Sequence, residues 1–217
     1  MYHINKYTLL IILSAAVMMN ACSDSTSALE EEVLSKIDIN IVENLYAPFD
    51  RNDPQNSPFV YFNLRTGETV DAEQADSQNW DIAFRGTSVI INSGDSGPGA
   101  AGALILDVEF DEVSIAPTEG YRQDHADEPA ITGNGGWYTY TGTQGNPAHA
   151  ILAHDDTTII MKTADGNHYV KLHIMSYYKG NPDYDTEEFV NLRTRPASQH
   201  YTFRYAIQMA EGLRDLK

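Results

Sequence analysis

Histidines stand in three polar, turn-rich stretches of the sequence, at His125, His149 and His154. Side chains that bind ligands usually project from loops rather than from the interior of a strand or helix. A neutral imidazole can bind a metal ion, and it is also an axial ligand of haem iron. These three histidines are therefore candidate ligands, and a solvated surface position is the alternative interpretation for each of them.

Two further histidines fall in a single predicted strand, residues 168–178 (HYVKLHIMSYY). His168 and His173 are five positions apart, so their side chains point to opposite faces of that strand and cannot both reach one iron. We expect His173 to pack against its neighbours on the same face. Met161 and Met175 are interpreted as core residues rather than as ligands.

Acidic residues around His125 offer a different chemistry. Asp124, Asp127 and Glu128 lie with it in one stretch, and together they would hold a divalent cation if that stretch curled. A solvated acidic loop is the favoured alternative, here and for residues 183–188 (DYDTEE). No Gly-x-Ser-x-Gly or His-Glu-x-x-His motif occurs in the sequence. We therefore expect a protein that is not an enzyme, and a cation-dependent hydrolase is the weakest alternative.

The composition excludes some partners. The chain has 217 residues, with 14 lysines and arginines against 31 aspartates and glutamates, for a formal charge of −17. Proteins that bind nucleic acid neutralise phosphates with Lys and Arg, so we do not expect this acidic chain to bind it. The single cysteine, Cys22, can form neither an intramolecular disulfide nor a cysteine-rich zinc site. The length fits one domain.

The amino-terminal segment has the pattern of an export signal. Lys6 is followed by an uncharged apolar run, residues 8–19, that is short for a membrane span and is followed by a small residue and Cys22. This arrangement resembles a bacterial lipoprotein signal, in which Cys22 is lipidated and anchors a domain to the membrane without spanning it. We expect residues 1–21 to be the signal peptide, residues 22–36 a lipidated, flexible tether, and residues 37–217 the folded domain.

From Ile37 onward, short segments of alternating apolar and polar residues are separated by clusters of Gly, Pro, Asn and Asp. This period-two pattern is typical of β-strands, and its repetition predicts an all-β, antiparallel domain. Residues 157–162 and 168–178 are expected to form a hairpin, because the Asp-Gly pair between them is a strong turn signal. The alternation predicts that Trp80, Phe84, Trp137 and Phe203 are buried and that Asp81, Arg85 and Arg204 face water or a polar rim.

Aromatic and glycine-containing motifs follow one another from about residue 37 to residue 208. They are Tyr61–Leu64 with Thr66-Gly67, Asn79–Arg85, Pro117–Tyr121, Gly136–Tyr138, Thr163–Gly166, Lys171 with Tyr177-Tyr178, and Tyr201–Tyr205. In this order they resemble the HmuY-like haem-binding lipoproteins of Bacteroidetes. The resemblance implies a two-layered antiparallel β fold and a lipid-anchored protein of the outer membrane, at the cell surface. It also implies haem or host haemoproteins as partners, and an outer-membrane receptor that receives the haem.

The same resemblance implies where haem ligands lie. In the family, one axial histidine precedes the Gly-Trp strand and the second follows it by a few residues. His125 lies in the first segment, and His149, with His154 as its substitute, lies after the strand. A domain this acidic repels the haem propionates unless it has a local basic rim, for which Arg122, Lys171 and Arg204 are candidates.

Two functions of different classes thus remain open. The first is a surface-anchored lipoprotein that binds haem and captures it for uptake. The alternative is a surface module on the same fold that binds a glycan or a protein partner, and the 13 tyrosines of the chain favour it.

Overall fold

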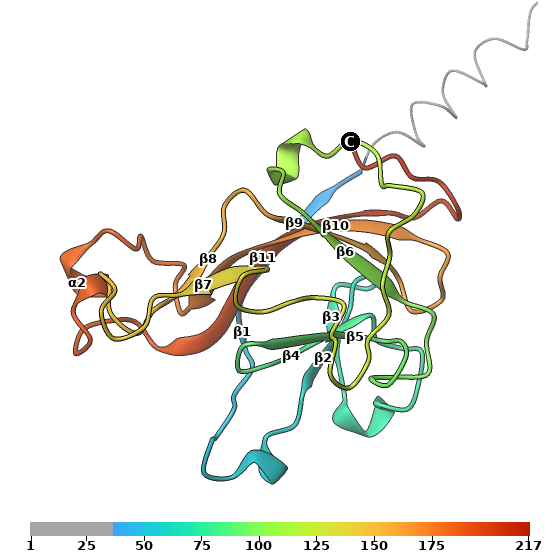
Figure 1. Ribbon diagram of the computed structural model, residues 1–217. Coiled ribbons are helices and arrows are strands. Elements are labelled where there is room, and N and C mark those ends of the chain that lie inside the picture. Colours follow the sequence, from blue (N-terminus) through green and yellow to red (C-terminus); the bar gives the residue numbers. More distant parts are fainter. Residues whose placement is uncertain (1–36) are drawn as a thin grey trace, which may run out of the picture. The chain divides into compact units, whose positions relative to one another are not determined.

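Figure 1 shows the computed structural model of the chain, which describes residues 37–217. The predicted signal peptide and tether, with Cys22, lie outside the described residues. The described part consists mainly of β-strands, and its paired strands are antiparallel. The prediction of an all-β antiparallel fold is confirmed.

The larger sheet has five strands in the order β1-β11-β10-β9-β6. Two of its strands, β9 and β10, form the hairpin that the Asp-Gly pair predicts, with Lys162 paired to Tyr169. Gly166 in the turn has a φ of +76°, a conformation that glycine adopts at no steric cost. The strands are β1 (Ile39–Tyr46), β6 (Gly102–Leu106), β9 (Thr158–Lys162), β10 (Tyr169–Tyr178) and β11 (Ser198–Gln208).

The second sheet has four strands in the order β3-β2-β4-β5, and a third sheet has the two strands β7 and β8. Among residues 37–217, no helix is both long and apolar enough to cross a membrane. The strands are β2 (Val60–Asn63), β3 (Glu68–Val70), β4 (Ile82–Arg85), β5 (Ser88–Ile91), β7 (Tyr138–Tyr140) and β8 (Ile151–Ala153). The helical turns are η1 (Pro54–Asn56), η2 (Ala72–Gln74), η3 (Phe110–Glu112) and α2 (Glu187–Val190).

Aromatic side chains fill the core between the two larger sheets. The ring of Phe203, on β11, lies 5.5 Å from that of Phe62 and 5.4 Å from that of Phe84, between centroids, and these two residues come from the other sheet. Such contacts between aromatic rings stabilise the packing of the two layers beyond the contribution of the buried apolar area. Trp80, Phe84, Trp137 and Phe203 are all buried, as predicted.

The five-stranded sheet is also covered on its outer face. Ile160 on β9 points away from the main core and packs in a second cluster with Val113, Ala116 and Leu216. The turn η3 lies over the same face, and Phe110 from this turn is fully buried. Residues of β9 and β10 that point outward are therefore not exposed as a simple alternation would predict.

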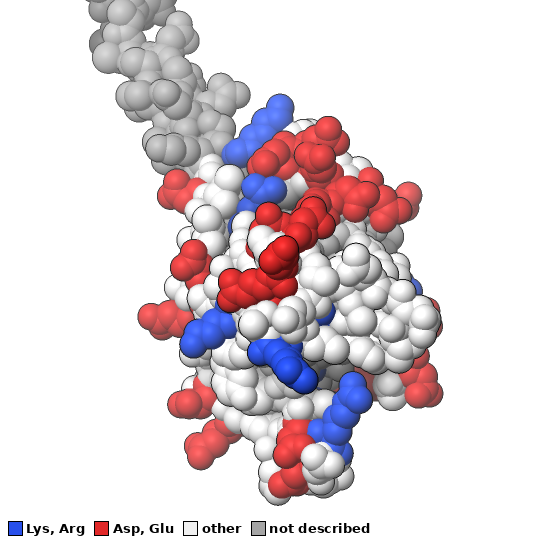
Figure 2. Space-filling view, turned by 90° about the vertical axis from the view of Figure 1, so that its left-hand side faces the viewer, with Lys and Arg blue, Asp and Glu red and all other residues white. Residues whose placement is uncertain are grey.

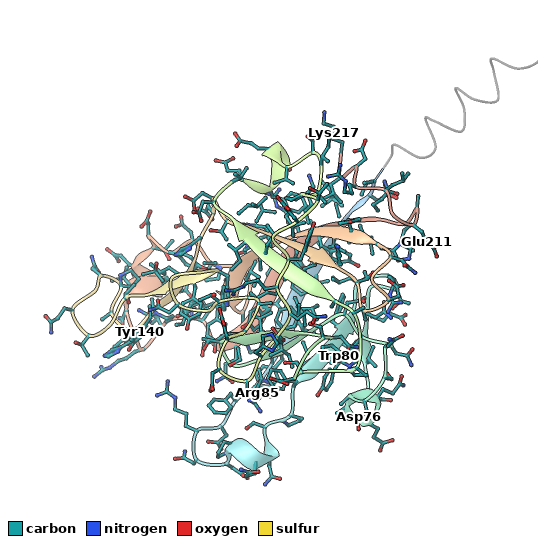
Figure 3. All side chains as sticks on the ribbon, turned by 45° about the vertical axis from the view of Figure 1, so that its right-hand side comes forward. Asp76, Trp80, Arg85, Tyr140, Glu211 and Lys217 are labelled. Carbon is teal, nitrogen blue, oxygen red and sulfur yellow. The ribbon has the colours of Figure 1, made fainter. Side chains whose placement is uncertain are left out.

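The position of Asp81 differs from its prediction. Asp81 is fully buried rather than exposed, because loops from elsewhere in the chain cover it. Its carboxylate accepts hydrogen bonds from the backbone N–H groups of Leu64 and Ala164, at 2.8 and 2.7 Å. Arg85 is partly exposed, and its guanidinium lies 4.1 Å above the ring of Phe59. Figure 3 labels Arg85 and Trp80.

Candidate functional site

A cleft of about 840 Å³ opens between β8, β10 and the loop of residues 181–185, and we call it the β8–β10 cleft. Two other hollows, of about 380 and 390 Å³, are smaller. Apolar side chains of β8 and the thioether of Met175 form part of the lining, with His173 and Tyr184. The lining is mixed, because charged and polar side chains share it with these apolar groups. The volume of the cleft is within the range of sites for small organic ligands.

His173 is held in one orientation on the outer face of β10. Its Nδ1 atom lies 2.9 Å from the carbonyl oxygen of Thr157, the residue before β9. A carbonyl oxygen only accepts, so the hydrogen is on Nδ1 and the lone pair is on Nε2. The ring lines the β8–β10 cleft, and no described residue makes a hydrogen bond with Nε2. The imidazole is thus presented in a tautomer that can bind a metal.

Met175 and Tyr184 form the neighbouring part of the cleft wall. The Tyr184 hydroxyl donates a hydrogen bond of 3.5 Å to the carbonyl oxygen of Met175. The ring of Tyr184 lies 4.8 Å from that of Phe189 on α2, which fixes the loop that carries it. Burial raises the pKa of Tyr184, so the hydroxyl stays protonated at neutral pH.

Arg204 provides positive charge at the same cleft. In the register of the antiparallel strands β10 and β11, Arg204 is the residue opposite His173. Its guanidinium lies 3.2 Å from a carboxylate oxygen of Asp111 and 4.4 Å above the ring of Phe110. Four acidic residues also line the cleft: Glu109, Asp155, Asp183 and Asp185. Figure 2 shows that acidic side chains dominate the upper part of this side of the molecule.

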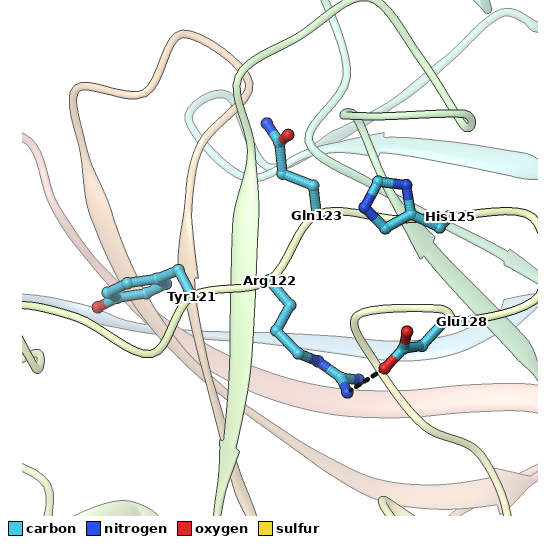
Figure 4. A pocket seen from close by; sticks show the side chains of 5 residues that line it. All are labelled: Tyr121, Arg122, Gln123, His125 and Glu128. Carbon is cyan, nitrogen blue, oxygen red and sulfur yellow. Dashed lines mark hydrogen bonds and ion pairs between the residues drawn. The ribbon is translucent and has the colours of Figure 1, made fainter.

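A second, smaller pocket contains two of the predicted site residues, Arg122 and His125 (Figure 4). The Arg122 guanidinium lies 3.4 Å from the Glu128 carboxylate and donates a hydrogen bond of 2.8 Å to the carbonyl oxygen of Pro129. His125 is exposed, with Nδ1 at 3.9 Å from a carboxylate oxygen of Asp95. The structure brings Arg122 and His125 together, but neither His149 nor His154 lines this pocket.

The acidic stretch that suggested a cation site has a structural role at its first residue. Asp124 is buried, and its two carboxylate oxygens accept hydrogen bonds of 2.8 Å from the backbone N–H groups of Ile91 and Ala130. These bonds tie the segment to β5 and hold the Asp124 carboxylate in the interior, facing backbone donors. Within residues 37–217, no group of three His, Cys, Asp or Glu side chains is arranged to hold a metal ion.

His149 and His154 both belong to the β7–β8 hairpin. The Nδ1 atom of His149 lies 2.7 Å from the hydroxyl of Tyr140, and both side chains are exposed. His154 has both ring nitrogens in contact, Nδ1 with the carbonyl oxygen of Gly136 at 2.9 Å and Nε2 with the hydroxyl of Thr139 at 2.7 Å. An iron ligand at His154 would have to give up one of these two contacts. Tyr140 lies at the far end of this hairpin region in Figure 3.

Lys171 does not lie at an open rim, which corrects its predicted position. It is buried beneath η3, where its ammonium group donates hydrogen bonds of 3.1 and 2.8 Å to the carbonyl oxygens of Phe110 and Val113. Burial also lowers the pKa of Lys171. This ammonium therefore stabilises the turn above it rather than an incoming anion.

Sequence reasoning missed His173 as a site residue. It assigned the side chain to the correct face of the strand, with Lys171 and Met175, but predicted only packing there. The sequence signal was its position two residues before Met175, which places both side chains on the same face of the strand. In the structure, η3 covers this face at Lys171, whereas His173 and Met175 line the cleft. The cleft depends on the 181–185 loop, which the strand pattern does not place.

Comparison with known proteins identifies a family. A family model described as HmuY protein matches residues 55–192. No curated protein matches the chain. The matched range includes His125, His149, His154 and His173, whereas Arg204 lies beyond it.

Proposed function

The chain belongs to the HmuY family, and from this premise we propose that it is a surface-anchored lipoprotein that binds haem and captures it for uptake. The family is associated with haem binding and is not known for catalysis. The protein accordingly acts as a binding protein rather than as an enzyme. Haem or host haemoproteins are its partners, and an outer-membrane receptor takes the haem from it.

The observation that carries this proposal is the match of the HmuY family model to residues 55–192. The β8–β10 cleft is larger than the two other hollows described above. Its volume of about 840 Å³ falls in the range of roughly 300–1,000 Å³ that is usual for sites of small organic ligands. His and Met are both established axial ligands of haem iron, and the cleft offers one of each. Arg204 lines the same cleft together with four acidic residues, and its guanidinium already lies 3.2 Å from a carboxylate oxygen of Asp111.

The loop histidines remain an alternative ligand set. His125 with His149, or with His154 in its place, would bind the iron from two loops, and Arg122 would form the rim beside His125. His125 and His149 are exposed, so binding would not have to displace a packed side chain. The two sets make different predictions for single substitutions, so they can be told apart.

The anchor rests on the sequence pattern around Cys22. In this proposal the lipid on Cys22 holds the domain at the outer membrane, facing the cell surface. Residues 22–36 then act as the tether between the lipid and the domain.

Titration of the purified full chain with ferric haem tests the function. We expect a Soret band that shifts from that of free haem and saturates near one haem per chain. Metal-free protoporphyrin serves as a control for binding without iron ligation. A spectrum identical to that of free haem throughout the titration would reject haem as the ligand.

The alternative function is a module that binds a glycan or a protein partner. Exposed aromatic residues favour it, since Tyr46 and Tyr140 are 56% and 47% exposed and aromatic rings commonly stack on sugars or fill interfaces. Binding to immobilised glycans by a protein that leaves the haem spectrum unchanged would support this alternative.

A further inference from the structure

We propose that the β8–β10 cleft binds an aliphatic polyamine, a ligand in which ammonium groups are joined by chains of methylene groups. This inference goes beyond the proposed function, because the ligand is a cation and its binding does not depend on haem. The cleft opposes haem itself, since the propionates are anionic and four carboxylates belong to the lining. Of the two ligand sets for haem, this leaves the loop histidines.

The charge of the lining is the first argument. Among the described residues of the lining, Arg204 is the only Lys or Arg. Its guanidinium lies 3.2 Å from a carboxylate oxygen of Asp111 and 4.4 Å above the ring of Phe110, so its charge already has a partner. A cleft lined by charges of one sign attracts ligands of the opposite sign. The carboxylates of the lining, all exposed, are those of Glu109, Asp155, Asp183 and Asp185.

These carboxylates come from three separate segments, which favours a ligand with more than one charge. Glu109 stands between β6 and η3, Asp155 follows β8, and the other two belong to the loop before α2. A flexible chain that carries amines several bonds apart can approach carboxylates on different walls. Each ammonium and carboxylate pair then forms a charge-assisted hydrogen bond.

The hydrogen-bonding groups of the lining are the second argument, because most of them accept. Carboxylates only accept, and so does Nε2 of His173, since the hydrogen of this ring is on Nδ1, 2.9 Å from the carbonyl oxygen of Thr157. His173 is 5% exposed, and no described residue makes a hydrogen bond with its Nε2. The Tyr184 hydroxyl donates to the carbonyl oxygen of Met175. An ammonium group has three donors and no acceptor, and it therefore complements this lining.

Apolar side chains provide a surface for the methylene groups. Leu152 and Ala153 of β8 and Met175 of β10 belong to the lining, and all three are partly buried. An alkyl chain that covers them removes apolar surface from water while its charged ends stay with the carboxylates, as in the side chain of a lysine. This mixture of apolar wall and acidic rim favours a polyamine over an inorganic cation.

Calorimetric titration of the purified full chain with spermidine tests the inference. The chain has a formal charge of −17 and attracts any polycation, so the titration needs about 0.15 M salt, where the Debye length is about 8 Å. We expect saturable binding of one spermidine per chain. Magnesium chloride at the same concentration is the probe for charge alone, and it should give no such isotherm.

Two double variants change the net charge equally and separate the cleft from the rest of the surface. Asp155→Asn with Asp183→Asn should weaken spermidine binding by about tenfold. Asparagine at 183 keeps the Oδ1 atom that accepts from the backbone N–H of Asp185 at 2.9 Å. The control is Asp76→Asn with Glu211→Gln, at two exposed residues labelled in Figure 3 that do not line the cleft, and it should bind as the wild type does. Equal weakening in both double variants would overturn the inference, because net charge would then explain the binding.

A measurement on the wild type does not depend on the folding of a variant. In nitrogen NMR of histidine-labelled protein, the Nε2 signal of His173 should move as spermidine is added, because its lone pair accepts from an ammonium group. His200 is the internal control, since its Nδ1 lies 2.8 Å from the carbonyl oxygen of Ser198 but the residue does not line the cleft. A His173 signal that stays in place while spermidine saturates the protein would overturn the assignment to this cleft.

A titration with trilysine separates a small polyamine from the lysine side chains of a protein partner. Saturation by trilysine without any response to spermidine would overturn the polyamine and assign the cleft to a basic segment of a partner. Haem binding is measured independently by the Soret titration, so failure of this inference and failure of the proposed function are distinguishable.

Discussion

The Oδ1 atom of Asp81 accepts a hydrogen bond of 2.7 Å from the backbone N–H of Ala164, a residue 83 positions further along the chain. Oδ2 of the same carboxylate accepts from the N–H of Leu64, and the Arg65 guanidinium lies 3.3 Å from Oδ1. Leu64 follows β2, whereas Ala164 lies in the turn between β9 and β10. A single buried side chain thus connects the two large sheets.

Replacement of this carboxylate should destabilise the fold. Asp81→Ala leaves two backbone N–H groups without their acceptor and Arg65 without its buried counter-charge, and we expect a loss of about 3–5 kcal/mol in the free energy of unfolding. Urea unfolding followed by tryptophan fluorescence measures it. Asp76→Ala, at an exposed carboxylate, is the control and should change stability by less than about 0.5 kcal/mol. Equal unfolding midpoints for Asp81→Ala and wild type would contradict this role.

Trp80 is the second position at which we expect a large loss. It is fully buried, its Nε1 donates to the carbonyl oxygen of Ala75 at 2.9 Å, and its ring lies 4.8 Å from that of Tyr61. Trp80→Ala would leave a cavity and should cost about 3–5 kcal/mol. Tyr140→Ala removes a half-exposed ring and should cost far less. A small effect of Trp80→Ala on thermal unfolding would show that the core collapses around the cavity.

Buried tyrosines make the protein sensitive to alkaline pH. Burial raises the pKa values of Tyr177, Tyr184 and Tyr201 above the ordinary value of 10.0. The native state then keeps protons that the unfolded chain releases, so this contribution is fully present below pH 10 and is lost as pH rises further. Urea midpoints measured between about pH 8 and pH 11 should be flat at first and then fall. Midpoints that rise over the upper part of that range would contradict the sign.

Tyr201→Phe tests the origin of that fall. Tyr201 donates its hydroxyl to the carbonyl oxygen of Gly86 at 2.8 Å. The substitution removes one titrating group, so the variant should lose stability less steeply with pH than the wild type, from a lower starting value. A slope equal to that of the wild type would assign the alkaline loss to other tyrosines.

The predicted lipid anchor depends on one sulfur atom. Cys22→Ser removes the only thiol of the chain and leaves the apolar run before it intact. We expect the variant to lose lipidation and to leave the detergent phase in a phase-partitioning experiment. Partitioning of the variant together with the wild type would refute lipidation at Cys22.

The strands and the aromatic core could be predicted because their signals are local. Period-two alternation places Phe84 inward from its own neighbours, and Asp165-Gly166 defines its hairpin within five residues. The burial of Asp81 and Lys171 could not be predicted in this way. Each is covered by a segment from a distant part of the chain, the β9–β10 turn in one case and η3 in the other.

The candidate site was predicted only in part, for the same reason. Alternation along β10 predicts the face of the sheet to which His173 points. Whether a side chain on that face is covered or exposed in a cleft depends on the loop that packs over it. η3 closes the face at Lys171, and the loop with Tyr184 leaves it open as a cleft at His173. Arg204, which the sequence offered as a basic rim residue, lines the β8–β10 cleft with His173 and does not line the pocket of His125.

The pairing of β1 with β11 has a consequence for folding kinetics. Ile39, at the start of β1, pairs with Ala206, near the end of β11, so the first and last strands of the described chain are neighbours. The edge of the large sheet cannot form until nearly the whole chain is available, and contacts of such long sequence separation slow folding. β11 also lies between β1 and β10, so a chain that ends before Ser198 lacks the strand that joins them. Folding of the large sheet therefore awaits its last strand, and chains that lack β11 leave unpaired the edges of β1 and β10 that β11 covers in the folded domain.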